Sequence, residues 1–302
     1  MQRIGGRMSK NGLVNRLGGP EAASGLAMIS PTAIYAVLML AGPLTAVVLY
    51  SVMTDGQNRI EWDFTWANYI EVWSSPVYRA IMLRSLTVSF AVTLVTVLVA
   101  YPIAYFVSFH VAPSKKSIWL FLITIPFWTS YLIRVFLWKV ILGYNGVFSS
   151  GLEFLGLTSE PMSFMTNATS AMIVTLAHAY APFAILPIFV ALEKIDRSFL
   201  EAGQDLGETK FTTFLRVTLP LSMSGVIAAV LIVFIPTIGD YVTPDLIGSG
   251  KFPMIANAIE VQLLKLNHKA LGSALAVSAM IIVAVVSLIF LMLNRRFLGA
   301  AK

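Results

Sequence analysis

The sequence predicts an all-α membrane protein with six transmembrane helices, and three features of its 302 residues support this fold class. Hydrophobic residues make up 57% of the chain and charged residues only 12%, whereas soluble domains carry roughly 25% charged residues. The apolar residues form runs long enough to cross a bilayer core, which takes roughly 20 residues per helix. These runs lack the alternation over about ten residues that is typical of membrane β-strands. The composition therefore argues against a soluble enzyme, a DNA-binding domain and a disordered chain.

Six uncharged runs give the expected spans in chain order. They are Leu26 to Met53, Ser85 to Phe109, Ser117 to Ile133, a stretch within Pro161 to Leu192, a stretch within Val217 to Gly239, and a stretch within Ala270 to Leu293. The third run is about the minimum length, and its continuation past Arg134 is left open. The first run follows a basic polar segment and is too long for the core of a signal peptide, so we expect it to be an uncleaved span.

The distribution of basic residues orients these spans. With the N-terminus inside, thirteen of the 21 Lys and Arg residues fall on inner segments and eight on outer ones. Because Lys and Arg are enriched in cytoplasmic loops, we expect both termini in the cytoplasm. The domains expected are a cytoplasmic segment at residues 1–25 and one six-span domain at residues 26–298, embedded in a lipid bilayer. The net charge of +6 then belongs to residues that flank spans, and no nucleic-acid partner is expected.

The loop between the fourth and fifth spans contains the signals of a short helix. Ser198 and Glu201 have the spacing of a capping box, which predicts a helix start at Ser198. Gly207 is placed to end this helix in the left-handed conformation. Thr209 can cap a second helix, and Pro220 is tolerated in the first turn of the fifth span. The apolar side of the first helix would consist of Leu200, Ala202 and Leu206. These signals alone would also suit an ordinary helical loop of any polytopic protein.

The spacing of residues in this loop resembles the EAA loop of ABC importer permeases. The sequence reads Glu201-Ala202-Gly203, three residues, Gly207, nine residues, Val217, one residue, Leu219-Pro220. The family pattern is Glu-Ala-Ala, three residues, Gly, nine residues, Ile, one residue, Leu-Pro. The chain departs from it at Gly203 and Val217, and neither change adds bulk or charge. We therefore interpret residues 193–220 as a cytoplasmic coupling loop of this kind.

Other segments extend the resemblance to the spermidine/putrescine branch of type I, binding-protein-dependent importers. They are residues 100–105, 126–134, 141–143, 182–183, 186–187 and 239–248. Relatives in this branch also import opines, phosphonates and other small solutes. The resemblance covers roughly residues 26 to 298, and the first 25 residues carry no part of it.

The resemblance implies a complex in the bacterial inner membrane. In such importers two six-span permeases pair, two ATPase subunits bind below them, and a periplasmic solute-binding protein docks above. We expect the second permease to be a different chain, because this branch usually uses two. ATP and Mg would be bound by the partner ATPase, so this chain would have no cofactor, no metal and no catalytic residue. The residues implied to couple with the ATPase are Ser198, Glu201, Ala202, Gly203, Asp205, Leu206, Gly207, Leu219 and Pro220. For Glu201, an internal cap and a charged contact to the ATPase both remain open.

Other chemical signals in the sequence are weak. Gly248-Ser249-Gly250-Lys251 lacks the first glycine and the final Ser or Thr of a phosphate-binding loop. His178 lies inside a span, where we favour a packing or path-lining role over a metal site. An intramembrane hydrolase would need a nucleophile with a positioned base, which the sequence does not offer. An ion-coupled secondary transporter is the better alternative, but the six runs contain no Asp, Glu, Lys or Arg.

Residues at the outer ends of the third and fifth spans are expected to line the translocation path. They are Trp128, Tyr131, Arg134, Asp240 and Tyr241. An aspartate at the edge of an apolar span is costly unless it is paired, hydrated or functional. Asp240 would attract ammonium groups, and nearby aromatic rings would add cation–π contacts of about 0.5–2 kcal/mol each. We therefore expect a small organic cation, a polyamine, as the solute. Arg134 keeps a small anion open as the alternative, and Asp240 could instead cap a short helix or pair with Arg134.

Overall fold

In the residues that it describes, the computed structural model has only helices as regular elements, apart from one small antiparallel hairpin. It describes residues 20–56, 59–158 and 168–298. The hairpin pairs β1 (Thr54–Asp55) with β2 (Ile60–Glu61). The all-helical architecture confirms the predicted fold class.

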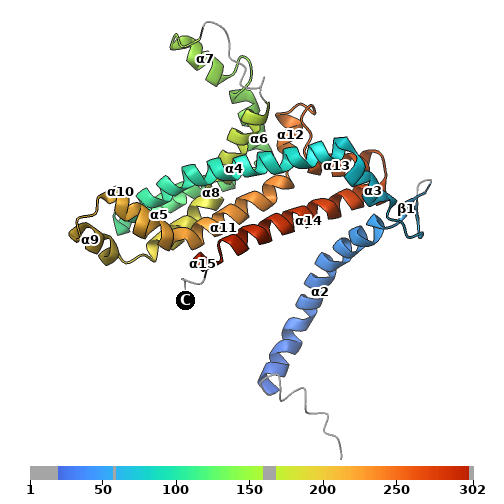
Figure 1. Ribbon diagram of the computed structural model, residues 1–302, viewed down its shortest axis with the longest axis horizontal. Coiled ribbons are helices and arrows are strands. Elements are labelled where there is room, and N and C mark those ends of the chain that lie inside the picture. The colour runs from blue at the N-terminus through green and yellow to red at the C-terminus, as the bar shows by residue number, and fades with distance from the viewer. Residues whose placement is uncertain (1–19, 57–58, 159–167, 299–302) are drawn as a thin grey trace, which may run out of the picture.

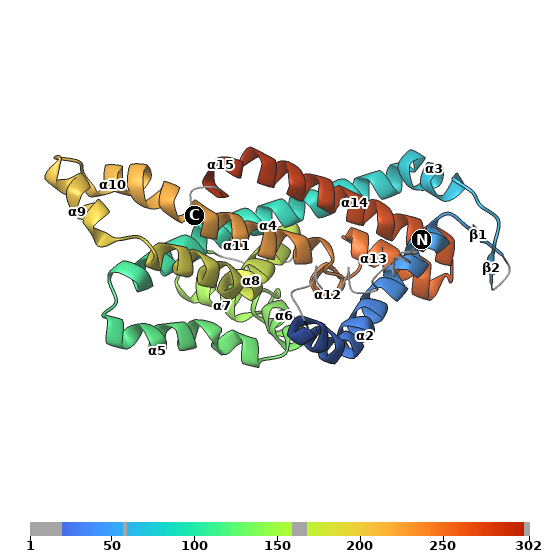
Figure 2. The same ribbon diagram turned by 90° about the horizontal axis from the view of Figure 1, so that it is seen from below.

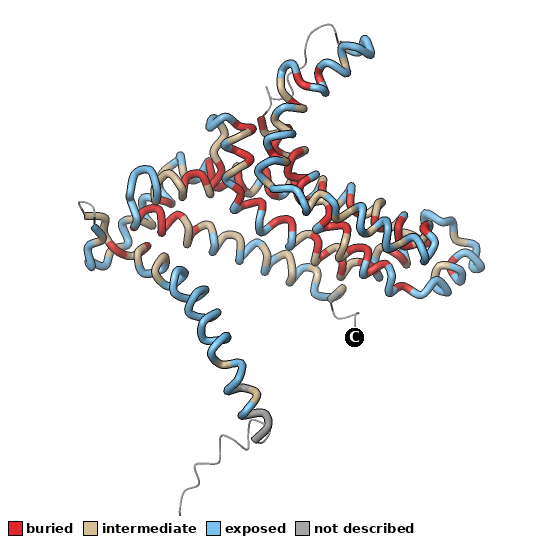
Figure 3. The backbone as a smooth tube through the Cα atoms, turned by 180° about the vertical axis from the view of Figure 1, so that it is seen from behind, coloured by how far each residue is buried: buried red, intermediate tan, exposed pale blue. Residues whose placement is uncertain are grey.

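Four long helices form an elongated bundle (Figure 1). They are α4 (Pro76–Phe109), α8 (Ala168–Glu193), α11 (Leu219–Ile238) and α14 (Lys269–Leu293). A fifth helix, α2 (Pro20–Ser51), begins away from the bundle and reaches α14 at its C-terminal end, so that its side chains are exposed along most of its length (Figures 1 and 3). Met28, for example, is 83% exposed. Apolar side chains exposed on a helix suit a lipid environment, and helical hydrogen bonds satisfy the backbone groups that lipid cannot.

Five helices in the described part of the chain are long and apolar enough to cross a membrane, or six if one bent pair is a single span. The five are Ala27–Ser51, Pro76–Phe109, Ala168–Glu193, Lys210–Ile238 and Lys269–Leu293. They correspond to the first, second, fourth, fifth and sixth predicted runs. Most of the expected segment 1–25 lies outside the described residues, as does the beginning of the fourth run at Pro161.

The third predicted span, from Ser117 to Ile133, coincides with the bent pair, and the second helix of that pair continues past Arg134. Its two parts, Pro113–Trp128 and Tyr131–Ile141, differ in direction by 88°. The first part consists of α5 (Pro113–Thr124) and the 3₁₀ turn η1 (Ile125–Trp128), and the second part is α6 (Tyr131–Ile141). Pro126 lacks a backbone N–H, and the residues between η1 and α6 are extended, so helical hydrogen bonding stops there.

The core lies where α4, α8 and α11 pack together. Its fully buried residues include Val92, Ala100, Ala104, Leu176, Ile188, Ala229 and Val233. Gly225 allows the closest approach of α8 and α11, because a Cβ there would lie 2.5 Å from both the Cβ of Ala191 and the carbonyl oxygen of Pro187. Buried hydroxyls on α4 donate to carbonyls one turn back, as Thr93 does to Ser89 at 2.7 Å. The helices therefore pack closely without a charged side chain in this core.

Shorter elements gather at the two ends of the bundle (Figures 1 and 2). At one end lie α9 (Arg197–Asp205), α10 (Lys210–Thr213) and the π-helical turn η3 (Phe214–Thr218). At the other lie the hairpin and α3 (Ala67–Ser74), with α13 (Ile255–Glu260) nearby. The remaining elements are α7 (Val147–Phe154), α12 (Val242–Leu246), η4 (Val261–Lys265) and α15 (Arg295–Leu298). The coupling loop and the hairpin therefore lie at opposite ends of the long helices.

Polar side chains join separate elements at each end. Near α9, the Lys116 ammonium and the Glu193 carboxylate form an ion pair at 2.5 Å, and the Ser108 hydroxyl donates to the same carboxylate at 2.6 Å. At the opposite end, the Asp55 carboxylate accepts a hydrogen bond from the backbone N–H of Ala270 at 2.9 Å and so caps α14. The first set of contacts joins α4, α5 and α8, and the second joins β1 to α14.

Candidate coupling loop and buried polar cluster

Helix α9 starts one residue earlier than predicted, because Asp196 caps it. The Asp196 backbone is extended, and its Oδ1 accepts a hydrogen bond from the backbone N–H of Ser198 at 2.9 Å. This hydrogen bond holds the pKa of the Asp196 carboxyl below its usual value. The predicted capping box of Ser198 and Glu201 is therefore wrong, since Asp196 already bonds the free N–H that the cap must satisfy. Glu201 lies one turn inside the helix, so the internal-cap role is corrected as well.

Gly207 ends α9 in the left-handed conformation, as predicted, with φ of +84°. The N–H of Glu208 donates to the Gly203 carbonyl at 3.1 Å, and the N–H of Gly207 donates to the Gln204 carbonyl at 2.9 Å. These two hydrogen bonds form a Schellman motif, which satisfies carbonyls at the end of the helix. The direction in which the chain leaves α9 is thus set by one glycine.

After this turn, α10 packs back against α9. Thr209 caps α10 as predicted, because its Oγ1 accepts a hydrogen bond from the backbone N–H of Thr212 at 3.2 Å. Gly203 is buried against α10, and a Cβ at that position would lie 3.1 Å from Cγ2 of Thr213. The two short helices therefore form a compact unit that can move as one body.

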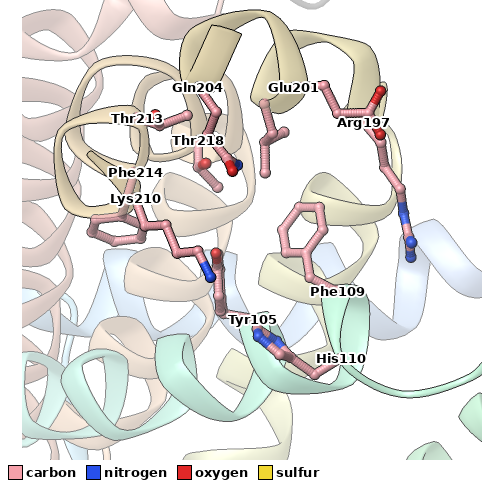
Figure 4. Close-up of a pocket in the computed structure, with 11 residues that line it drawn as sticks. Tyr105, Phe109, His110, Arg197, Glu201, Gln204, Lys210, Thr213, Phe214 and Thr218 are labelled. Atoms are coloured by element: carbon pink, nitrogen blue, oxygen red, sulfur yellow. The ribbon is translucent and has the colours of Figure 1, made fainter. Parts of the chain in front are cut away.

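One face of α9 lines a pocket of about 280 Å³ between the loop and the bundle. From α9 it takes Arg197, Leu200, Glu201 and Gln204, and from the end of α4 it takes Tyr105, Phe109 and the C-cap residue His110. Figure 4 shows Glu201 and Gln204 on one side of this pocket, with Tyr105 and His110 across from them. Lys210, Phe214 and Thr218 complete it from α10 and η3.

Apolar side chains stand exposed at the tip of the loop. Phe199 is 57% exposed, Leu206 is 85% exposed, and Phe211 of α10 is 70% exposed. The predicted apolar side of α9 is therefore divided, because Leu200 faces the pocket and Leu206 faces outward. Of the other predicted coupling residues, those exposed are Ser198, Glu201, Ala202, Asp205, Gly207 and Pro220, Leu219 is half-buried, and Gly203 is buried. Large exposed apolar groups at one tip are typical of a surface that meets another protein.

The loop is joined to the fifth span without a break. Pro220 lies in the first turn of α11, as predicted, but the helical run extends back through η3 to Lys210. The fifth span therefore begins before Val217, where the uncharged run starts. One continuous helical run, Lys210–Ile238, therefore joins α10 to α11.

Asp240 lies in a buried polar cluster between α11 and α12 and is only 7% exposed. Its Oδ1 accepts hydrogen bonds from the backbone N–H groups of Val242 and Thr243 at 3.1 and 3.5 Å, so Asp240 does cap α12. Its Oδ2 is buried and makes no hydrogen bond of regular geometry in the described residues, although the Tyr131 and Thr243 hydroxyls lie close to the carboxylate. The hydroxyls of Tyr131 and Thr243 are hydrogen-bonded at 2.9 Å, which brings α6 against α12. A buried carboxylate oxygen without a partner is costly unless a ligand or a moving side chain satisfies it.

Arg134 belongs to the same cluster. Its guanidinium carbon lies 5.9 Å from the centre of the Tyr131 ring. Its Nε and Nη1 atoms are buried, and no described residue bonds them. The ion pair that the sequence left open between Arg134 and Asp240 is not formed in the structure, where neither group has found its counter-charge.

The other two predicted path residues lie apart from this centre. Trp128 is 77% exposed and meets Phe121 edge-on, with ring centres 5.8 Å apart. The Tyr241 side chain is 51% exposed, and its carbonyl accepts a hydrogen bond from Nδ2 of Asn257 at 2.9 Å. Sequence reasoning missed Thr243, although its position three residues after Asp240 is the spacing of a helix cap.

A protein-family model and curated relatives match most of the chain. The model describes a binding-protein-dependent transport system inner membrane component and matches residues 66–299. The spermidine/putrescine transport system permease protein PotB of Haemophilus influenzae is 34% identical over 254 residues, which cover 84% of this chain and 88% of the relative. The PotB protein of Escherichia coli K12 is 33% identical over 236 residues, 78% of this chain and 85% of the relative. The inner membrane ABC transporter permease protein YdcU of the same strain is 29% identical over 232 residues, 74% of each chain.

Solved structures give a matching fold. A chain in the crystal structure of a bacterial ABC transporter involved in the import of the acidic polysaccharide alginate superposes with a TM-score of 0.68. The alignment covers 89% of this chain and 94% of that chain at 18% sequence identity. At this identity the likeness concerns the arrangement of helices.

Proposed function

The chain belongs to the family of binding-protein-dependent transport system inner membrane components, and from that premise we propose that it forms the translocation path of an importer for polyamines. As a permease of this family it is a multi-pass inner-membrane subunit of an ABC importer and is not itself an enzyme. It acts with a solute-binding protein, and ATP is bound by the partner ATPases rather than by this chain.

The buried Asp240 carboxylate is the observation that carries the polyamine proposal. Its free Oδ2 offers a negative charge in a cluster that includes the Tyr131 ring, and ammonium groups bind such arrangements through hydrogen bonds and cation–π contacts. Relatives named as spermidine/putrescine permeases, at up to 34% identity over most of the chain, support the same solute class. An opine, a phosphonate or another small anion is the alternative that Arg134 favours.

We further propose the assembly and orientation that the sequence predicts. The chain pairs with a different permease, two ATPases bind on the side of α9, and the solute-binding protein docks at the opposite end. Residues 26–298 form the six-span domain, and both termini are cytoplasmic. The exposed Phe199, Leu206 and Phe211 side chains support α9 and α10 as the ATPase contact. Recovery of only one permease species from an active complex would contradict the pairing of two different chains.

Uptake into vesicles that contain the reconstituted importer tests the solute class. We expect ATP-dependent uptake of labelled putrescine or spermidine, and a strong loss of uptake in Asp240→Asn, which removes the charge at nearly constant volume. Lys251→Gln, at the exposed turn after α12, changes one charge outside the cluster and serves as the control. Uptake unchanged in Asp240→Asn would remove Asp240 from the path. Uptake of only an anionic solute would overturn the polyamine assignment, and uptake independent of ATP would favour the secondary transporter.

A further inference from the structure

The cluster around Asp240 contains two unsatisfied charged groups of opposite sign. Asp240 presents Oδ2, and Arg134 presents Nε and Nη1, all buried and without a hydrogen-bond partner in the described residues. Isolated buried charges are strongly unfavourable, because the solvation lost on burial is not replaced. The two groups therefore each need a counter-charge that this conformation does not provide.

Tyr131 connects the elements that carry these two groups. The Arg134 guanidinium lies over the Tyr131 ring, and the Tyr131 hydroxyl bonds Thr243, whose N–H in turn bonds Asp240. Arginine has a long side chain with several rotatable bonds, so a change of rotamer moves its guanidinium by several ångströms while α6 stays in place. Arg134 thus lies in the same cluster as the free carboxylate oxygen without being bound to it.

We propose that Arg134 is the tethered counter-cation of Asp240. In the importer without solute its guanidinium binds the free Oδ2, and an ammonium group of the solute displaces it when the path is loaded. The identity of the displacing group as a solute ammonium rests on the proposed function, whereas the pairing of Arg134 with Asp240 does not. The structure has the two groups unpaired, so the proposed pair forms only when the Arg134 side chain changes its rotamer.

This exchange makes Arg134 a specificity-determining residue. A solute cation must compete with a guanidinium that is already attached to the protein, and therefore present at high effective concentration. A small monovalent ion gains one contact and loses this competition, whereas a polyamine gains further contacts through its other ammonium groups and wins. Removing Arg134 should therefore lower the discrimination against monovalent cations as well as leave Asp240 unpaired.

A double-mutant cycle on the intact, solute-free importer in lipid nanodiscs tests the pairing. The variants are Arg134→Gln, Asp240→Asn, the two combined, and Arg134→Lys, with Lys139→Gln in the last turn of the same helix α6 as the matched control. The measurement is the rate at which assembled importer is lost at a fixed high temperature.

We expect each neutralising single variant to be lost about ten-fold faster than wild type, which corresponds to about 1.4 kcal/mol. The double variant should be lost no faster than either single one, and Lys139→Gln should match wild type. Spermidine should slow the loss of Arg134→Gln more than that of wild type, because an ammonium replaces the missing guanidinium.

Additive effects in the double variant would overturn the pairing, as would equal effects of Arg134→Gln and Lys139→Gln. Should Arg134→Gln fail to assemble, recovery of assembly in the double variant would support the pairing, and continued failure would count against it. The solute-free cycle is decided without any transport measurement. A wild-type importer that takes up no polyamine would refute the proposed function alone, and an additive cycle in an importer that does take up polyamines would refute the pairing alone.

Discussion

Replacing Gly207 by valine would alter the turn that joins α9 to the rest of the coupling loop. The left-handed conformation at this residue, with φ of +84°, costs a residue with a Cβ about 1–2 kcal/mol, and a β-branched residue more. No described atom lies within 4 Å of a Cβ at Gly207, so the cost comes from the backbone and not from a clash. Since 1.4 kcal/mol is a factor of ten, the native turn should become about ten-fold or more less populated relative to other turns. The hydrogen bond from Glu208 to Gly203 would be lost with it.

Transport and ATP hydrolysis measured together on the reconstituted importer give the assay. We expect Gly207→Val to lower solute uptake per ATP hydrolysed while the membrane-spanning helices stay folded, because the change lies outside them. Gly207→Asn should lose less, since asparagine tolerates the left-handed conformation better than other residues with a Cβ. Gly42→Val is the matched control, because Gly42 lies inside α2 with no described atom within 4 Å of its Cβ position. Wild-type uptake and stoichiometry in Gly207→Val would refute both the strain argument and the coupling role of the loop.

Two further substitutions test the loop and the bundle. Glu201→Lys puts a third positive charge beside Arg197 and Lys210 in the pocket, so we expect lower uptake per ATP hydrolysed with normal assembly. Glu201→Gln should have a smaller effect. Equal uptake in wild type and both variants would contradict a charged role for Glu201. Gly225→Ala would place a methyl group 2.5 Å from atoms of α8, an overpacking that typically costs about 1–3 kcal/mol. The temperature of thermal inactivation should fall in Gly225→Ala and stay unchanged in Gly42→Ala. An unchanged temperature in both variants would mean that α8 and α11 can move apart at Gly225 without loss of stability.

Local chemistry was sufficient for much of the fold and for part of the coupling loop. The uncharged runs located five long helices, because the length and composition of a span are properties of a continuous segment. Gly207 was predictable as a left-handed residue and Thr209 as a cap, since each acts on atoms within a few positions of itself. Asp240 was predicted at the outer edge of a span, where it would serve the path, cap a short helix or pair with Arg134, and the structure shows the capping.

Only the tertiary structure decided which of two suitable residues caps a helix, and which residues far apart in the sequence contact one another. Asp196 and Ser198 are both good caps by residue type, and the path of the chain from α8 selected Asp196. The 88° bend after Pro126 lies in a run whose apolar composition also fits a straight helix. The contact that sets the spacing of α8 and α11 at Gly225 joins residues more than thirty positions apart. The buried charges of Arg134 and Asp240 were visible as residues in the sequence, but their lack of partners follows from how α6, α8 and α12 pack, because burial and pairing are properties of the assembled helices and not of any one segment.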